Sequence, residues 1–496
     1  MIRSGLFNSI GAVLRMAISI VSIPLLIRII GVEGYGIWTL VSTVVAIATL
    51  AEAGLSVSTT VFLSKDLAGN NRNEIFKTVT ISFTLVILLG VIISIFLYLV
   101  SHHLITIFTD LSGDQLNNAI SASKLGGFVV AARLIQRICV GIVQAYQAYG
   151  LLNIASTIQA FLTNFGMLIV ATYSTSVLRL MQWHLASSII ILGLYALLII
   201  YLLPTSKFTP TWCKKRFLDM IQYGGLTWLS SIGSALFSRF DKLFLSLFIG
   251  TEVLGIYAAF TDISSQINSF SAVAIQPILP EFSKQIESSY ANISLKEIQC
   301  KALNTLYIHS LITATLGGLI ITLAPFALKI VLPEVDLVTI LIPFQIVSAI
   351  YTVYSLNAVG YYMMLAFKKA KTCTALVLSS GIFSLFLIVT GAKFYGLLGA
   401  ILGNIGYIAT LSIIDLGMKY ISIPRFKWIK KLVPFSLWFS SVLFINAYLA
   451  FQSELYQDSY QRILIFVIQN IVMAILLFMF FQNRKNLELK KIEQAS

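Results

Sequence analysis

The stretch Ile30–Trp38 reads IGVEGYGIW, and it returns as Ile249–Tyr257, which reads IGTEVLGIY. The shared pattern is I-G-x-E-x-x-G-I followed by an aromatic residue, and the two copies stand 219 residues apart. Gly141 and Gly360 have the same spacing. An internal repeat of this length predicts that the chain consists of two similar halves.

The composition decides the environment of these halves. Of the 496 residues, 58% are hydrophobic and 11% are charged, against about 25% charged residues in a typical soluble domain. So little charge cannot solvate the outside of so apolar a chain, which excludes a soluble protein. Fourteen apolar stretches approach the roughly 20 residues that a helix needs to cross a bilayer. They centre near residues 18, 48, 88, 135, 163, 193, 235, 267, 316, 350, 382, 407, 442 and 472.

Six spans separate the repeated motifs, and this even number gives both copies the same orientation across the membrane. Since backbone polar groups in lipid must be satisfied within their own segment, the spans are expected to be helices. We therefore predict an all-α polytopic membrane protein with 14 transmembrane helices, in two six-helix lobes in a parallel-repeat arrangement plus two extra C-terminal helices. The expected parts are an N-lobe (1–206), a C-lobe (207–424), the extra helix pair (425–483) and a cytoplasmic tail (484–496).

The 34 Lys and Arg residues outnumber the 20 Asp and Glu residues, and their positions set the orientation. Most of the basic residues fall in alternate loops, such as Lys65–Lys77, Lys207–Arg216 and Lys419–Lys431. The positive-inside rule makes these loops cytoplasmic. We expect a multi-pass protein of the cell (inner) membrane with both termini in the cytoplasm. The basic charge has a topogenic role, and no nucleic-acid partner is expected.

Motifs of common enzymes are missing from the sequence. It contains no Gly-Lys dipeptide and hence no P-loop for ATP, and His-Glu-x-x-His and Gly-x-Ser-x-Gly are absent too. The four cysteines lie far apart without the spacing of metal ligands. The four histidines are scattered and are interpreted as solvated or core residues. We expect no catalytic residue, no cofactor and no metal, and therefore no enzyme.

Polar residues form a stripe in the spans that precede the two motifs. They recur in steps of three, four and seven, which places each stripe on one face of a helix. Because a polar face toward lipid is costly, both stripes are expected to face a shared cavity. The candidate substrate-binding residues of these stripes are Asn8, Ser19, Thr227, Ser234 and Ser238. Span eight adds Ser265 and Asn268 on broadly one side.

Three arginines fall inside the spans of the N-lobe, against the single acid Glu52. Arg133 and Arg137 lie one turn apart on span four, and Arg15 lies near the middle of span one. The planar fork of arginine suits bidentate binding of phosphate, so these residues are candidate ligands of an anionic substrate. The alternative is an ion pair of one arginine with Glu52 that holds helices together.

Acids inside the spans are the candidates for coupling to an ion gradient. Burial favours the protonated form of a carboxylic acid, so such a group changes charge with its surroundings. Asp262 ranks first because it lies on the polar face of span eight, and Glu52 and Asp241 follow. The alternatives are an acid that only bonds neighbouring hydroxyls and, for Asp241, a local ion-pair network with Arg239 and Lys242.

The residues from Asn8 to Trp38, with the run PLLIRIIGVEGYGIW, resemble the start of polysaccharide-biosynthesis flippases. The element Glu52–Leu55 is similar to one in which many members have Asp, and Ser238–Phe260 resembles the turn between spans seven and eight. Gln276–Pro280 is similar to the end of span eight in that family. The resemblance is to the O-antigen flippase type of the multidrug/oligosaccharidyl-lipid/polysaccharide exporter superfamily.

This resemblance implies a two-lobed carrier that opens alternately to either side of the membrane. Its partners would be an undecaprenyl-pyrophosphate-linked oligosaccharide and the lipid bilayer, with contact to the polysaccharide polymerase machinery as a further expectation. Two other functions stay open. One is a multidrug or small-molecule cation antiporter of the same superfamily. The excess of arginine favours an anionic substrate over a cation. The other is a membrane polysaccharide polymerase, whose large outer loop this chain lacks.

Overall fold

The structure of the protein is a computed structural model. It describes residues 2–52, 54–69, 72–203, 210–275, 295–332, 335–367 and 369–451, together with 464–465, 467–469, 471–472 and 475. Every secondary-structure element within these residues is a helix. The chain forms two compact units, of which unit 1 is Met1–Ala259 with Thr374–Gly406 and unit 2 is Phe260–Cys373 with Tyr407–Ser496. The predicted division at residues 206 and 424 stays a prediction.

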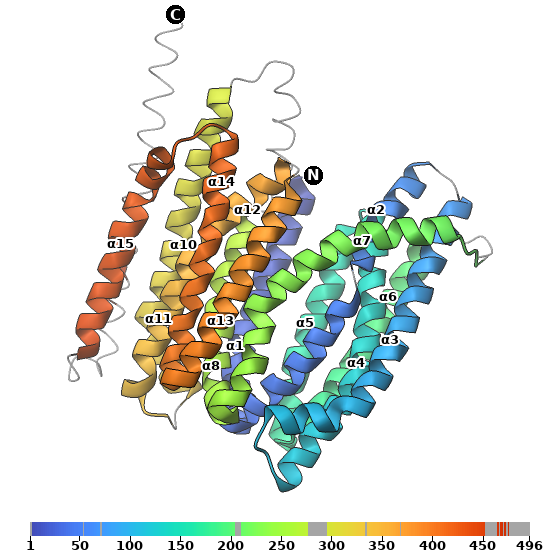
Figure 1. The fold of residues 1–496 in the computed structure, drawn as a ribbon, viewed down its shortest axis with the longest axis horizontal. Coiled ribbons are helices and arrows are strands. Elements are labelled where there is room, and N and C mark those ends of the chain that lie inside the picture. Colours follow the sequence, from blue (N-terminus) through green and yellow to red (C-terminus); the bar gives the residue numbers. More distant parts are fainter. Residues whose placement is uncertain are drawn as a thin grey trace, which may run out of the picture. The chain divides into compact units, whose positions relative to one another are not determined.

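Unit 1 contains the first seven α-helices. Helix α4 packs against α3 and α6, and α1 packs against α5 (Figure 1). The elements are α1 (Ile2–Ala48), the 3₁₀-helix η1 (Thr49–Glu52), α2 (Leu55–Ala68), α3 (Arg72–Phe108), α4 (Gly113–Ala145), α5 (Tyr149–Tyr173), α6 (Val177–Leu202), α7 (Lys214–Ala235) and the π-helix η2 (Leu236–Phe240). Three elements are shared by the units, namely α8 (Asp241–Ile275), α13 (Ala370–Gly403) and the 3₁₀-helix η3 (Asn404–Leu411).

Unit 2 has its core between α10 and α15. Helix α10 also packs against α11, and α12 packs against α14. Buried apolar residues such as Leu311, Phe435 and Trp438 fill the space between these helices. The elements are α10 (Leu295–Val331), α11 (Leu337–Ser355), α12 (Asn357–Ala366), α14 (Ser412–Tyr420) and α15 (Arg425–Phe451).

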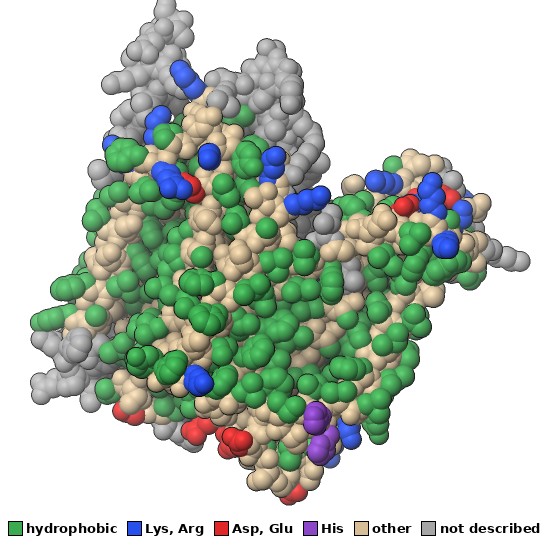
Figure 2. Space-filling model, viewed as in Figure 1, with side chains coloured by type: hydrophobic (Ala, Val, Ile, Leu, Met, Phe, Trp, Pro, Cys, Tyr) green, Lys and Arg blue, Asp and Glu red, His purple; other side chains and the backbone are tan. Residues whose placement is uncertain are grey.

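The described helices confirm a polytopic membrane protein. Ten of them are long and apolar enough to cross a membrane. Two of the ten, Ala17–Ala68 with 52 residues and Lys371–Tyr420 with 50 residues, each cover two predicted spans. Large apolar side chains such as Leu99 and Ile200 are 71% exposed, as expected for helix surfaces that face lipid. Figure 2 shows hydrophobic side chains over much of the viewed surface. The predicted span near residue 472 lies where the structure describes only isolated residues, so the count of fourteen stays a prediction.

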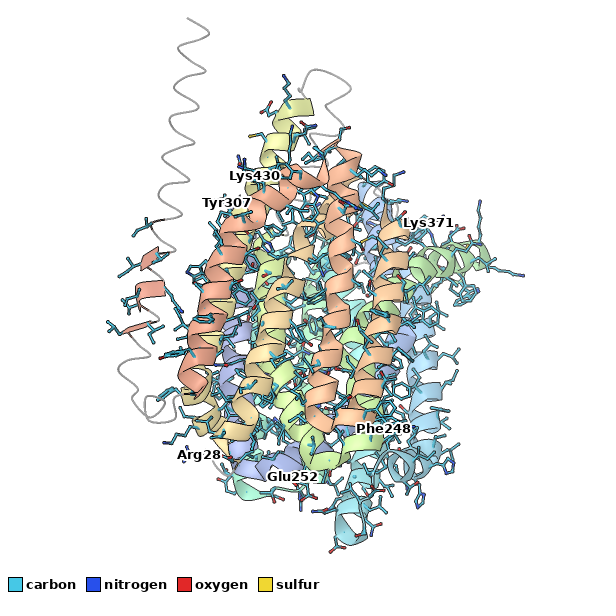
Figure 3. The ribbon with its side chains drawn as sticks, turned by 60° about the vertical axis from the view of Figure 1, so that its left-hand side comes forward. Arg28, Phe248, Glu252, Tyr307, Lys371 and Lys430 are labelled. Carbon is cyan, nitrogen blue, oxygen red and sulfur yellow. The ribbon has the colours of Figure 1, made fainter. Side chains whose placement is uncertain are left out.

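The backbone bends in the same way at both copies of the repeated motif. Gly31 interrupts α1 with φ 78° and ψ 168°, and Gly250 interrupts α8 with φ 73° and ψ 170°. A positive φ with an extended ψ is a conformation that only glycine adopts readily, which explains why both copies have glycine here. Glu252, beside the second bend, lies at the same end of unit 1 as Arg28, beside the first (Figure 3).

The two motifs also pack against each other inside unit 1. A Cβ on Gly36 would lie 1.8 Å from the carbonyl oxygen of Thr251, and one on Gly255 would lie 2.3 Å from that of Val32. The contact is reciprocal, because Thr251 and Gly255 are the repeat equivalents of Val32 and Gly36. Two residues without side chains thus allow the backbones of α1 and α8 to cross in contact.

Ion pairs hold the start of α7 to α2 and α3. The guanidinium of Arg216 lies 2.8 Å from Asp66 and 2.7 Å from Glu74. Thr78 donates a hydrogen bond to the other oxygen of Asp66, whose side chain is 6% exposed. Farther along α7, the indole of Trp228 donates to the backbone carbonyl of Leu50 at 2.6 Å.

Candidate functional site

The second predicted span is broken, and the break positions Glu52. Helix α1 ends at Ala48, η1 follows, and α2 begins at Leu55 after Gly54 in the left-handed conformation. Glu52 accepts a hydrogen bond of 2.8 Å from the backbone N–H of Ser56 and so satisfies one of the free amides at the start of α2. Its carboxylate is buried next to the N-terminus of α2, where the helix dipole favours negative charge.

Arg137 is the cation that pairs with this acid. Its Nη1 lies 3.2 Å from Oε2 of Glu52, and its side chain is 57% exposed while that of Glu52 is 6% exposed. The ion pair of an arginine with Glu52, which the sequence offers as an alternative, therefore exists in the structure. It fixes the end of the guanidinium that meets Glu52 and leaves the rest of the group accessible.

Arg133, one turn before Arg137, has a neutral partner. Its Nη2 lies 2.9 Å from Nε2 of His184 on α6. A guanidinium has no acceptor, so Nε2 must accept, and the imidazole is neutral with its proton on Nδ1. The ring of His184 is also in contact with that of Trp38, at 5.9 Å between centroids. Arg133 is therefore oriented by a partner that leaves its positive charge uncompensated.

Arg15 on α1 is held by α5. Its Nη1 donates to the hydroxyl of Ser156 at 3.0 Å and approaches the side-chain oxygens of Asn153 and Thr157 at 3.5 Å. These three partners are neutral and occupy one face of α5 in steps of three and four. Like Arg133, Arg15 is positioned by neutral partners that do not compensate its positive charge.

The arginines belong to one electrostatic group. The charges of Arg15 and Arg133 are both close enough to act on the phenol of Tyr195 on α6, and the like charges of Arg133 and Arg137 act on each other. Beside them, Gln136 donates to the backbone carbonyl of Ser188 at 2.6 Å and ties α4 to α6. Within the described residues, the arrangement presents two guanidinium groups without a carboxylate partner and a third that is partly engaged. Its chemistry suits binding of an anion with several oxygens.

A second polar cluster in unit 1 surrounds Asp241. This residue is 1% exposed, and its carboxylate accepts a hydrogen bond of 2.9 Å from the hydroxyl of Tyr257. The amide of Asn404 in turn donates to the tyrosine oxygen at 3.2 Å. Lys242, the next residue, is also buried at 3% exposure. A carboxylate, a phenol and an amide thus meet at the junction of α8 and η3.

The remaining predicted residues are less enclosed. Asp262 on α8 is half-buried, and its backbone carbonyl accepts from the hydroxyl of Ser265 at 2.8 Å. Asn268 lies one turn farther along α8 and is half-buried too, as is Ser19 on α1. Four predicted positions have side chains outside the described part of the structure, namely Asn8, Thr227, Ser234 and Ser238.

The partners of the arginines were not identified from the sequence. His184 and Tyr195 lie more than 50 residues from Arg133 along the chain, and a lone polar residue in an apolar span carries no pairing signal. The polar face of α5 was accessible to sequence reasoning, since Asn153, Ser156 and Thr157 have helical spacing within an apolar stretch.

Comparisons with known proteins extend this description. The family model described as "Polysaccharide biosynthesis protein" matches residues 1–286. Over 287 residues the chain is 23% identical to a protein of Shigella flexneri described as "Putative O-antigen transporter". The match covers 57% of the chain and 66% of the relative, so the chain spans just under two thirds of that relative's length.

Two solved structures resemble the chain in fold. One is the lipid II flippase MurJ in an inward closed conformation, with a TM-score of 0.72 and 14% identity over 96% of this chain and 99% of MurJ. The other is an inward-facing multidrug resistance MATE family transporter of the MOP superfamily, with a TM-score of 0.69 and 14% identity over 83% of this chain and 98% of that one. The fold of this chain is therefore similar to the folds of these two transporters.

Proposed function

The chain belongs to the polysaccharide biosynthesis protein family, whose model matches more than half of it, and from this premise we propose that it is a flippase. It translocates undecaprenyl-pyrophosphate-linked oligosaccharide repeat units, of O-antigen or a similar polysaccharide, from the cytoplasmic to the outer leaflet of the inner membrane. It does so by alternating access, with both termini in the cytoplasm.

The uncompensated charge of Arg15 and Arg133 carries this proposal. Within the described residues neither has a carboxylate partner; their hydrogen-bond partners are hydroxyls, an amide oxygen and a neutral imidazole. A guanidinium stays protonated, and charges inside spanning helices are retained where they meet a counter-ion or a polar pathway. Arg137 adds accessible N–H donors next to this pair. A pyrophosphate supplies both the charge and the oxygens that such a group binds.

The sugars of the substrate set the second requirement. Each hydroxyl that enters hydrocarbon without a partner costs about 2–7 kcal/mol. Hydroxyl and amide side chains lower this cost, and α5 supplies them beside Arg15 in Asn153, Ser156 and Thr157. Ser265 and Asn268 form a comparable surface on α8. The lipid tail stays in the bilayer throughout and needs no polar site.

We assign ion coupling to the cluster around Asp241. Coupling requires a group whose charge state differs between the two conformations of the carrier. Asp241 is more deeply buried than Asp262, and its partner Tyr257 lies beyond the bend at Gly250, where α8 changes direction. Movement at that bend alters the surroundings of the carboxylate. Glu52 is less suited, because its carboxylate is already engaged by Arg137.

A deletion strain tests the function. The proposal predicts loss of surface glycan with single lipid-linked repeat units retained on the cytoplasmic leaflet. Complementation by Arg133→Ala should fail while the protein remains in the membrane, Arg133→Lys should restore part of the export, and Arg179→Ala, an exposed control, should restore all of it.

The fold likeness to the MATE transporter supports a multidrug antiporter as second candidate. Drug hypersensitivity with normal glycan would establish that candidate and overturn the flippase.

A further inference from the structure

A basic pocket lies in unit 2, between the first turns of α10 and α15, and its lining contains no residue of the proposed substrate site. Its volume is about 240 Å³. This is below the roughly 300–1,000 Å³ of sites for drug-sized ligands, so it suits a head group rather than a whole lipid. Its polar lining consists of Lys296, Gln299, Asn304, Ser422, Lys427 and Lys431.

The fold fixes the shape of this pocket. Ser422 stands in the left-handed conformation with φ 57°. The N–H of Ile423 bonds to the carbonyl of Met418 and that of Ser422 to Lys419, which is the Schellman ending of α14. Gln299 of α10 then donates to the carbonyl of Ile421 at 2.8 Å and holds this turn against α10. The wall of the pocket is therefore built by tertiary contacts.

The lysines of α15 point into the pocket. Lys427 and Lys431 are one turn apart and continue the face that buries Phe435 and Trp438 against α10. The ammonium of Lys431 lies 5.8 Å from the centre of the ring of Tyr307. None of the described lining residues carries a carboxylate. The nearby Arg425, in contrast, is bound bidentately by Asp415 at 2.6–2.8 Å.

The position of the pocket matches the level of lipid head groups. Helices α10 and α15 both begin there, and Figure 2 shows Lys and Arg side chains gathered at this end of unit 2. Figure 3 places Lys371, Lys430 and Tyr307 at the same end. The positive-inside rule makes this end cytoplasmic, and basic pockets between spanning helices on that side bind anionic head groups.

We propose that this pocket binds the phosphate of an anionic phospholipid such as phosphatidylglycerol. The ammonium groups of Lys427 and Lys431 neutralise the phosphate, while Asn304 and Ser422 bond the oxygens of the glycerol. A bound head group bridges α10 and α15 and stabilises their packing at the membrane surface. The site does not rest on the proposed transport function.

Cys300 in the lining is exposed and reports occupancy directly. In a Cys213→Ser background the other two cysteines are buried. We expect a thiol reagent to modify Cys300 several-fold more slowly in nanodiscs rich in phosphatidylglycerol than in phosphatidylcholine nanodiscs. Replacing both Lys427 and Lys431 by Gln should reduce lipid affinity roughly thirtyfold, at about 1 kcal/mol per lysine, and remove the protection.

The matched control replaces Lys371 and Lys430, which lie at the same end but outside the pocket, by Gln. It changes the net charge equally and should keep the protection. This result separates a bound head group from a general effect of the negative surface potential of the lipid on the thiol. Equal rates in both kinds of nanodisc, or loss of protection in the control, would overturn the proposal. So would full protection of the detergent-solubilised protein by inorganic phosphate, since that result identifies a soluble anion as the ligand.

Discussion

The crossing of the two repeated motifs gives the sharpest structural prediction. In Gly36→Ala the new Cβ would lie 1.8 Å from the carbonyl oxygen of Thr251, whereas ordinary contacts of a Cβ begin at 3.4 Å. Helices α1 and α8 must therefore separate by roughly 1.6 Å at this point. Overpacking of this kind costs about 1–3 kcal/mol. At about 1.4 kcal/mol per factor of ten, the closed crossing loses population roughly 5- to 150-fold against an open one.

Gly34→Ala is the matched control within the same motif. The atoms nearest to its Cβ would belong to the side chain of Ile30 of its own helix, at 3.4 Å or more. Alanine also favours the helix over glycine by roughly 0.5–1 kcal/mol. The control should therefore leave the crossing closed or stabilise it, although the substitution is chemically identical.

A cysteine at Ile256, which is 8% exposed next to the crossing, measures the opening. When opening and closing are faster than modification, the labelling rate is proportional to the open population. In nanodiscs, with Cys213 and Cys300 replaced by Ser, Gly36→Ala should raise the rate by roughly 5- to 150-fold. Equal rates in Gly36→Ala and Gly34→Ala would refute the reasoning that the glycines exist to bring the backbones together.

Three further predictions concern the helices and their charges. Arg216→Ala should lower the thermal midpoint of the purified protein, because the buried carboxylate of Asp66 loses its cation at a cost of about 3–5 kcal/mol; its exposed neighbour Lys215→Ala is the control, and equal midpoints would contradict the role of the ion pair. Asp241→Asn should weaken the dependence of flipping on an imposed proton or sodium gradient and Asp262→Asn should not; the opposite order would show that the wrong acid was assigned. A cysteine in place of Lys215 should be labelled only from the cytoplasm, and labelling from outside would overturn the proposed orientation.

The repeat and its glycines could be predicted from the sequence, because their cause is local. A positive φ is an intrinsic demand of the bend, so Gly31 and Gly250 mark it in both copies. The close approach of Gly36 and Gly255 could not be derived in the same way. It depends on which helices cross, and that information is spread over the packing of the whole unit.

The arginines illustrate the same limit in the candidate site. Charges inside spans are conspicuous in the sequence, which makes Arg15, Arg133 and Arg137 candidates without a structure. Their partners were not, since His184 pairs with Arg133 only through the packing of α4 on α6.

The acids show how pattern and burial differ. Asp262 lies on a polar stripe, which drew attention to it, but it is only half-buried. Asp241 stands within a run of charges, and the local ion-pair network with Arg239 and Lys242 that this run predicts stays a prediction. In the structure its carboxylate meets Tyr257 across the bend in α8 and is buried, and no periodicity in the sequence indicates this contact.

Flipping by the purified protein tests the central claim most directly. The substrate is a fluorescent undecaprenyl-pyrophosphate-linked saccharide in proteoliposomes, and the measurement is the fraction that reaches the opposite leaflet. We predict transfer by the wild type, little transfer when Arg15, Arg133 and Arg137 are all replaced by Ala, and unchanged transfer by Arg179→Ala. Absence of transfer by the folded wild type, or full transfer by the triple variant, would contradict the account of a flippase whose arginines bind the pyrophosphate.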